Sequence, residues 1–318
     1  MRSSTNADPL RILFYAEGSK PDAWLAELRH AFPDAALRVW QEGDNDPADY
    51  AVVWKPPVAM LQARPGLKAI FNLGAGVDAI LAHGAALPQG VDIVRLDDAG
   101  MGVQMAEYVT YAVLRYFRRF DEFEMQARAA QWRFLKPHDK QQFSVGVLGL
   151  GVLGSQIIDA VAPFGFPLHG WSRSQKSLPG VTCHVGDAGL DAFLRASRVV
   201  VCVLPLTDAT RGILCRENLL KLPQGAYVVN VARGAHVVEA DLLALVQSGH
   251  LAAAMLDVFQ EEPLPPSHPF WQEPRITITP HMSALTLRAD SVRQIAEKMR
   301  ALARGEPVAG VVDQLKGY

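Results

Sequence analysis

The chain has 318 residues, which is long enough for two domains of ordinary size. Hydrophobic residues make up 49% of it and charged residues 20%, so it can fill a core and still present a solvated surface. Its formal net charge of -2 disfavours a general nucleic-acid binder, because such proteins usually carry a basic excess on one face.

The first hundred residues alternate between short apolar runs and a helical pattern. Apolar runs predict strands over 11–16, 37–40, 50–54 and 67–72, and an amphipathic pattern predicts a helix over 21–32. Strands that alternate with helices at this spacing indicate a parallel α/β unit.

Apolar residues at helical spacing then predict one long helix over 106–125, which would bridge two domains. A second α/β unit opens with a strand over 143–149 and a helix over 155–164. Its later strands are predicted at 167–171, 199–204, 226–230, 252–256 and 276–279. These are near-continuous apolar runs, which is typical of strands covered on both faces.

The end of the chain has a Pro-rich stretch over 260–274, which predicts a loop, and a helical pattern over 287–304. That last helix could cross back to the first domain. We therefore divide the chain into one domain of residues 1–105 plus 287–318 and a second domain of residues 106–286. Both are predicted to be α/β with a parallel sheet.

A glycine-rich turn with the spacing G-x-G-x-x-G follows the first strand of the second domain. Gly149 would permit the tight turn, Gly151 would let a pyrophosphate approach the backbone, and Gly154 would let helix and strand pack closely. Amides at the helix N-terminus, including those of Val152 and Leu153, would bind phosphate. The turn therefore predicts a dinucleotide site.

The next predicted strand ends about 20 residues after the glycines, where a ribose-binding acid normally lies. The chain has Ser172, Arg173 and Ser174 there and no acid. Arg173 would pair with the 2'-phosphate of NADP, and either serine could donate a hydrogen bond to it. The alternative is that Arg173 is an ordinary surface cation. We predict that NADP(H) is preferred, with NAD(H) possible.

Three further motifs follow the ends of later strands. Arg233 lies in V-N-V-A-R-G, Glu262 in D-V-F-Q-E-E-P-L-P, and His281 in P-H-M-S. In a parallel sheet these loops gather at the carboxyl ends of the strands, where ligands bind. Taken singly, each residue could be a surface charge or a structural histidine. Glu261 could compete with Glu262, but the D-x-F-x-x-E spacing selects Glu262.

With these motifs in this order, the chain resembles the D-isomer-specific 2-hydroxyacid dehydrogenase family over nearly its whole length. Within the family it is most similar to the glyoxylate/hydroxypyruvate reductase A group. V-L-P-L-T at 203–207 and A-E-Y at 106–108 are also similar. The resemblance implies two Rossmann-like or flavodoxin-like domains with an interdomain active-site cleft. The N-terminal domain would bind substrate, the other the dinucleotide, and the protein would be a homodimer.

The residue types suit the reduction of a 2-keto acid, which offers a carboxylate and a carbonyl. Arg233 can bind the carboxylate and polarise the carbonyl with its planar guanidinium. Hydride from the nicotinamide would reach the substrate carbon, and His281 would donate the proton to the oxygen. Glu262, if adjacent, would favour the imidazolium form of His281. We predict glyoxylate and hydroxypyruvate as substrates.

The substrate side is expected in the first domain. Small residues after the strand over 67–72 expose amides that can hold a carboxylate. These candidate contacts are Leu73, Gly74, Ala75, Gly76 and Val77. By resemblance, Trp54 lines the pocket, although it could instead belong to the domain core. Also by resemblance, the remaining candidate cofactor contacts are Met105, Leu204, Pro205, Thr207, Val231, Ala232 and Asp257.

Other classes of site have little support in the sequence. The three cysteines contain no C-x-x-C pair, so neither a metal site nor a disulfide framework is expected. The polar N-terminus and the lack of a long apolar run predict a cytoplasmic protein without a membrane span. Two alternatives stay open: a D-lactate, formate or phosphonate dehydrogenase, and a dinucleotide-sensing protein like the corepressors of this family.

Overall fold

The structure is a computed structural model that describes residues 9–62, 64–314 and 316–318. The chain divides into two compact units, Met1–Gly100 with Thr286–Tyr318, and Met101–Leu285. Each unit is built around a parallel sheet, which confirms the predicted α/β class. In the described ranges, no helix has the length and apolar character needed to cross a membrane.

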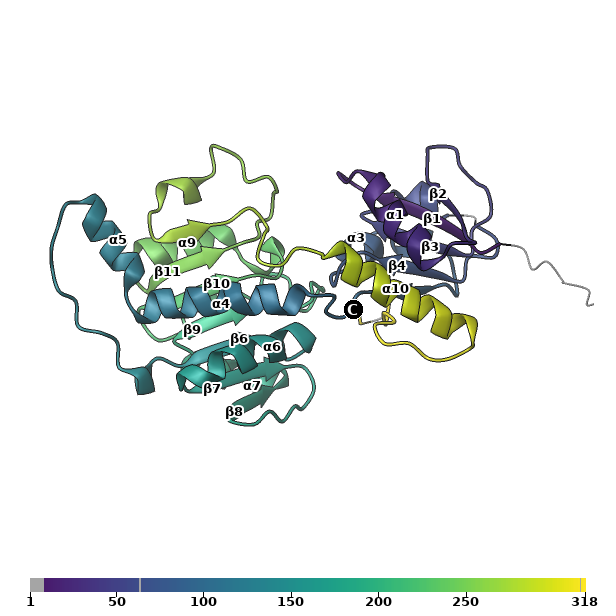
Figure 1. Cartoon of the computed structure of the whole chain (residues 1–318). Coiled ribbons are helices and arrows are strands. Elements are labelled where there is room, and N and C mark those ends of the chain that lie inside the picture. Colours follow the sequence, from purple (N-terminus) through teal and green to yellow (C-terminus); the bar gives the residue numbers. More distant parts are fainter. Residues whose placement is uncertain (1–8, 63, 315) are drawn as a thin grey trace, which may run out of the picture. The chain divides into compact units, whose positions relative to one another are not determined.

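The first unit contains a five-stranded sheet in the order β2-β1-β3-β4-β5 (Figure 1). Its strands are β1 (Arg11–Ala16), β2 (Ala36–Val39), β3 (Tyr50–Trp54), β4 (Ala69–Asn72) and β5 (Asp92–Val94). Its helices are α1 (Pro21–Ala31), α2 (Val58–Leu61), α3 (Asp78–Leu81) and α10 (Arg288–Ala303), with a 3-10 turn at Gly84–Ala86. Helix α10 packs beside α1, so the end of the chain returns to the first unit.

The second unit contains a seven-stranded sheet in the order β12-β11-β10-β9-β6-β7-β8. Its strands are β6 (Val145–Leu148), β7 (Leu168–Ser172), β8 (Val181–Val185), β9 (Val199–Cys202), β10 (Ala226–Asn230), β11 (Leu251–Leu256) and β12 (Ile276–Ile278). The strand order reverses between β6 and β9. In open parallel sheets, ligands bind outside the carboxyl ends of the strands at such a point.

The helices of the second unit cover both faces of this sheet. They are α4 (Met101–Phe117), α5 (Phe120–Arg128), α6 (Val152–Val161), α7 (Gly186–Ala196), α8 (Arg216–Leu219) and α9 (Glu239–Gln247), with 3-10 turns at Lys140–Gln142, Ala162–Phe164, Gly234–His236 and Pro269–Gln272. Apolar residues of α4 and α6 share one core with the sheet, and those of α7, α8 and α9 share another. This double cover explains why the central strands are apolar throughout.

The prediction of one helix over 106–125 is wrong. Helix α4 ends at Phe117, and α5 starts at Phe120 after Arg119, whose φ of 59° is left-handed. The Arg119 guanidinium donates to both carboxylate oxygens of Glu122 at 2.7 and 2.8 Å, and to the Lys136 carbonyl at 2.8 Å. These bonds hold a backbone conformation that disfavours a continuing helix.

Two short strands are missing from the sequence prediction. Strand β5 has three residues, and β8 is an edge strand whose residues are at most partly buried. A half-buried edge strand lacks the continuous apolar run that identifies a central one. The stretch 260–274 is irregular, as predicted, apart from its 3-10 turn.

Candidate active site

The glycine turn has the geometry that a phosphate-binding loop needs. Gly149 has φ +110°, a conformation that L side chains rarely adopt. A Cβ added at Gly154 would overlap the Gly149 carbonyl oxygen, so glycine is required for this close approach. A Cβ added at Gly151 would meet no atom within 4 Å, which leaves room for a ligand. Helix α6 begins at Val152, earlier than predicted, so the amides of its first turn lie beside that space.

The carboxyl end of β7 carries the three residues predicted to select the cofactor. Ser172 is buried, and its hydroxyl donates to the Ser174 carbonyl at 2.7 Å, which fixes the turn. Arg173 and Ser174 are exposed. Arg173 is therefore the cation that immediately follows the strand next to the glycine turn.

His281 and Glu262 are in direct contact. His281 Nδ1 lies 2.8 Å from Glu262 Oε2, and the other carboxylate oxygen accepts the Phe259 amide at 3.0 Å. The histidine and glutamate side chains are 43% and 33% exposed, so the pair is open to solvent on one side. Because a carboxylate can only accept, Nδ1 carries a proton and Nε2 is the nitrogen that can exchange one with a substrate.

Asp257 organises the loop that carries His281. Its carboxylate is fully buried and accepts the Thr279 hydroxyl at 2.6 Å and the amides of Met282 and Ser283, each at 2.8 Å. Its carbonyl accepts the His281 amide at 2.8 Å. His281 has a left-handed φ of 53°, and these bonds on both sides hold it there.

Tyr108 extends this network from α4. Its hydroxyl lies 2.7 Å from Thr279 Oγ1. Since Thr279 donates its own proton to Asp257, the tyrosine donates to the threonine. Burial, first among several causes, raises the pKa of Tyr108 well above its ordinary value, so the phenol keeps its proton.

Arg233 lies in a loop that is fixed by hydrogen bonds to two buried side chains, Asn230 and His236. The Asn230 amide group donates to the Arg233 carbonyl at 2.9 Å, and its oxygen accepts the Ala232 amide at 3.1 Å. His236 is fully buried, and its Nδ1 accepts the Arg233 amide at 3.2 Å. The Arg233 guanidinium donates to the Ala232 carbonyl at 2.7 Å. The backbone of Arg233 is thus fixed at the end of β10.

Gly234 explains why a glycine follows that arginine. A Cβ there would overlap the Phe259 backbone. The arginine loop therefore packs directly against the segment that carries Glu262. Arg233, Glu262 and His281 follow β10, β11 and β12, which are neighbours in the sheet, so the three lie along one edge of it.

The other candidate cofactor residues follow β9 and β10, except Met105, which lies on α4. Met105, Leu204, Val231 and Ala232 are buried in the cores of the second unit. The exposed Pro205 accepts the Thr210 hydroxyl on its carbonyl at 2.7 Å. Thr207 donates its amide to Thr210 Oγ1 at 2.9 Å.

In the first unit, the predicted substrate residues also lie together. A Cβ added at Gly74 would approach the Trp54 ring to 2.5 Å, so the indole lies over this glycine. The Asn72 amide group donates to the carbonyls of Gly74 and Gly76 at 3.0 and 2.8 Å. Leu73 and Val77 are buried, whereas Ala75 and Gly76 are partly exposed. The Gly74 and Gly76 carbonyls thus face Asn72, and the Leu73 amide donates to the Val53 carbonyl at 2.8 Å.

Sequence reasoning missed the residues that hold this site, namely Asn230, His236 and Thr279. Asn230 and Thr279 lie inside the motifs that carry Arg233 and His281, but their role depends on contacts across loops. No spacing rule identifies a buried histidine such as His236. The D-x-F-x-x-E spacing selected Glu262 over Glu261, and Glu262 is the glutamate in contact with His281.

The family model described as "D-isomer specific 2-hydroxyacid dehydrogenase, NAD binding domain" matches residues 110–283. Proteins named glyoxylate/hydroxypyruvate reductase A from Salmonella newport and Yersinia enterocolitica are 49% and 46% identical over 97% of this chain and 100% of their own length.

Solved structures agree. A D-isomer specific 2-hydroxyacid dehydrogenase from Xanthobacter autotrophicus Py2, in complex with NADPH and MES, is 41% identical with a TM-score of 0.92. It matches over 98% of this chain and 100% of its own. An NADPH-dependent glyoxylate/hydroxypyruvate reductase from Sinorhizobium meliloti, in complex with NADP and sulfate, is 35% identical with a TM-score of 0.90. It matches over 97% of this chain and 100% of its own. The chain therefore belongs to the D-isomer specific 2-hydroxyacid dehydrogenase family of NAD(P)-dependent oxidoreductases.

Proposed function

We propose that the protein reduces small 2-keto acids with NADPH, converting glyoxylate to glycolate and hydroxypyruvate to D-glycerate. The contact between His281 and Glu262 carries this proposal, because it builds a proton donor at the same carboxyl edge of the sheet as the glycine turn. The names of the curated relatives and the NADP complexes of the solved relatives support the same substrates and cofactor.

The chain's own residues divide the work of the reaction. A bound nicotinamide would supply a hydride to the carbonyl carbon. Arg233 would pair with the substrate carboxylate and polarise the carbonyl, so that charge developing on oxygen is stabilised. His281 would donate its Nε2 proton to that oxygen. Glu262 would accept the hydrogen bond from Nδ1 and pair with the imidazolium charge before transfer.

The residues present fit a dinucleotide. Open space at Gly151 beside the first turn of α6 suits a pyrophosphate, which the amides there would bind. Arg173 and Ser174 would hold the 2'-phosphate of NADPH. Trp54, with the loop 73–76, would bind the substrate from the first unit, and the indole over Gly74 would favour small acids.

The substrate proposal is tested by steady-state kinetics on glyoxylate, hydroxypyruvate, pyruvate and phenylpyruvate with each cofactor. We expect the first two to be reduced best, and NADPH to be used better than NADH. Turnover should fall by about 10²-fold or more in His281→Ala, the usual range for a general acid. His30→Ala, at an exposed position on α1, is the matched control. Cofactor binding without turnover of any 2-keto acid would instead favour a dinucleotide sensor.

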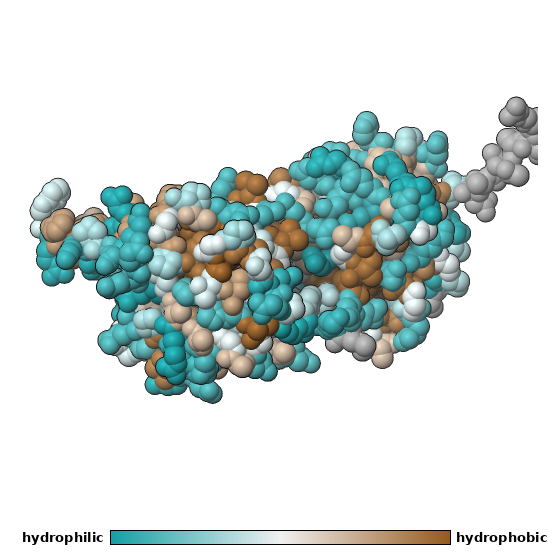
Figure 2. Space-filling view, turned by 90° about the horizontal axis from the view of Figure 1, so that it is seen from below, coloured by the Kyte–Doolittle hydropathy of each residue, from teal (hydrophilic) through white to brown (hydrophobic). Residues whose placement is uncertain are grey.

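We also propose that the protein forms a homodimer through the segment after α5. Trp132 and Phe134 are 104% and 82% exposed, so they lie fully in solvent in a single chain. Figure 2 shows apolar residues gathered in patches on a largely hydrophilic surface. Exposed aromatic residues of this kind are enriched at interfaces. Light scattering should give a dimer mass that falls in the double variant Trp132→Ser with Phe134→Ser.

A further inference from the structure

We propose that Glu239 is a positioning residue that holds the loop carrying Glu262, an inference that rests on the proposed function. Glu239 is the first residue of α9, and it lies outside the V-N-V-A-R-G, D-V-F-Q-E-E-P-L-P and P-H-M-S motifs. One of its carboxylate oxygens accepts the Gln260 amide at 3.0 Å. The other lies 3.3 Å from His268 Nε2. Gln260 and His268 stand on either side of Glu262 in the sequence, so one carboxylate holds both ends of its loop.

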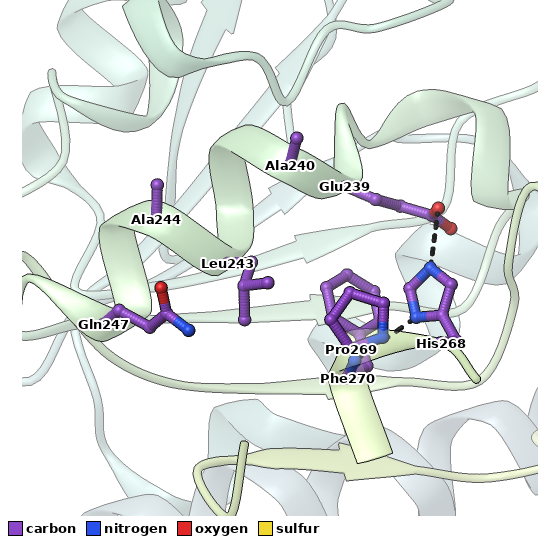
Figure 3. A pocket seen from close by; sticks show the side chains of 8 residues that line it. All are labelled: Glu239, Ala240, Leu243, Ala244, Gln247, His268, Pro269 and Phe270. Carbon is purple, nitrogen blue, oxygen red and sulfur yellow. Dashed lines mark hydrogen bonds and ion pairs between the residues drawn. The ribbon is translucent and has the colours of Figure 1, made fainter. Parts of the chain in front are cut away.

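The histidine contact does not require a charged imidazole. His268 Nδ1 accepts the Phe270 amide at 3.3 Å, so the neutral ring carries its proton on Nε2 and donates it to Glu239. Figure 3 shows both contacts, with Glu239 extending from α9 toward the His268 ring. Phe270 is 1% exposed, and its ring packs edge-on against that of His268, with 4.6 Å between ring centroids. One end of the loop is thereby attached to the core.

Hydrogen bonds also fix the other end of the loop, at Gln260. The Gln260 side-chain amide donates to the Val237 carbonyl at 2.8 Å, next to the start of α9. Phe259 is 7% exposed, and its amide is the donor to Glu262 Oε1. Both Glu239 and His268 side chains are only 18% exposed, so these bonds are partly shielded from water. The position of Glu262 therefore depends on a carboxylate whose partners are Gln260 and His268 at the two ends of the loop.

Loss of this carboxylate should reduce turnover more than binding. Misplacing a catalytic group by about 1 Å can cost up to about 10²-fold in rate, so we expect kcat to fall about tenfold in Glu239→Ala. KM for NADPH should stay unchanged. The kcat of Glu239→Gln should lie between those of the wild type and Glu239→Ala. Its amide oxygen still accepts from Gln260, but its NH₂ group cannot accept from His268.

The chain offers a matched control on the same helix. Asp241 also lies in the first turn of α9, and its carboxylate accepts the Arg216 amide at 2.8 Å, which holds α8. Asp241→Asn removes a carboxylate charge from the same turn without touching the loop of Glu262. We expect normal turnover from it.

A double-mutant cycle with Glu262→Ala tests the mechanism. If Glu239 acts through Glu262, Glu239→Ala should lower kcat in the wild-type background and change it little when Glu262 is already absent. Equal effects in both backgrounds would overturn the proposal. Amide hydrogen exchange across residues 257–268 measures the mobility of this loop directly, so it tests the role of Glu239 whether or not the protein reduces 2-keto acids. Exchange should quicken in Glu239→Ala but not in Asp241→Asn, and unchanged exchange would refute the role even if no 2-keto acid is reduced.

Discussion

Replacing Asp257 by asparagine should damage stability and turnover together. The buried carboxylate accepts the Thr279 hydroxyl and the Met282 amide on one oxygen, and the Ser283 amide on the other. The carboxamide has the same shape but only one accepting oxygen. If that oxygen stays with the first two donors, the NH₂ group faces the Ser283 amide, and two donors then oppose each other without an acceptor.

The magnitude follows from this count. One buried hydrogen bond to a charged acceptor is lost, which costs about 1.5–3 kcal/mol, and one buried amide is left unsatisfied. We expect a total loss of about 2–4 kcal/mol, and a fall in Tm of several degrees for a unit of this size. The three donors flank His281, so the loop that presents it should loosen and kcat should fall about 10- to 100-fold.

Thermal unfolding followed by circular dichroism, together with kcat on glyoxylate, checks this expectation. Thr279→Val provides a graded comparison, since it removes one of the three donors and leaves both amides paired. It should cost less than Asp257→Asn in both measurements. A Tm and a kcat for Asp257→Asn that match the wild type would show that the loop does not depend on the carboxylate.

Three further changes test other parts of the site. Arg173→Ala should reduce the ratio of kcat/KM for NADPH to that for NADH by about 10- to 100-fold, because a charge-assisted hydrogen bond is lost. Arg195→Ala, at another exposed arginine, should leave this ratio unchanged. An unchanged ratio in Arg173→Ala would show that Arg173 does not bind the cofactor. Gly154→Ala should weaken NADPH binding and lower Tm, because the added Cβ overlaps the Gly149 carbonyl; calorimetry that finds normal affinity would contradict this. Gly74→Ala should displace the Trp54 ring and raise KM for the keto acid with KM for NADPH unchanged; an unaltered keto-acid KM would refute it.

The sequence was sufficient for the parts of the site that follow from strand order. Arg233, Glu262 and His281 each follow an apolar run, and parallel strands bring such positions to one edge. The glycine spacing likewise predicted a tight turn at Gly149, which has φ +110°, and close packing at Gly154, where a Cβ would overlap the Gly149 carbonyl oxygen. In these cases the backbone alone determines the geometry, so a local pattern is enough.

The residues that support the site could not be predicted in this way. Asn230, His236 and Glu239 act through side-chain bonds to loops that lie elsewhere in the sequence. Asp257 was expected to contact the cofactor by resemblance, but the bonds of its buried carboxylate to the Met282 and Ser283 amides were not predicted. The break at Arg119 was missed because apolar spacing continues through Phe117 and Phe120, while a side-chain bond to Glu122 decides the backbone.

A last prediction concerns Asp121, which lies in the first turn of α5. Burial raises the pKa of its carboxyl to about 6, and nearby Arg115 only partly opposes this effect. Among the described residues, its Oδ1 is buried without a hydrogen-bond partner. A folded-state pKa above the ordinary value of 3.8 means that the folded state binds the proton more tightly. The stabilisation is therefore complete below about pH 4 and is lost as pH rises through about 6.

Asp121→Asn should remove this loss, because a neutral amide needs no proton to be buried. Raising the pKa from 3.8 to about 6 corresponds to at most about 3 kcal/mol, and partial exposure reduces this to about 1–2 kcal/mol. The variant should be more stable than the wild type at pH 8 and equal to it at pH 4, as measured by urea unfolding across that range. Asp187→Asn, at an exposed acid in the first turn of α7, should show no such gain at pH 8. A stability difference between Asp121→Asn and the wild type that is the same at both pH values would mean that the carboxyl titrates alike in the folded and unfolded states.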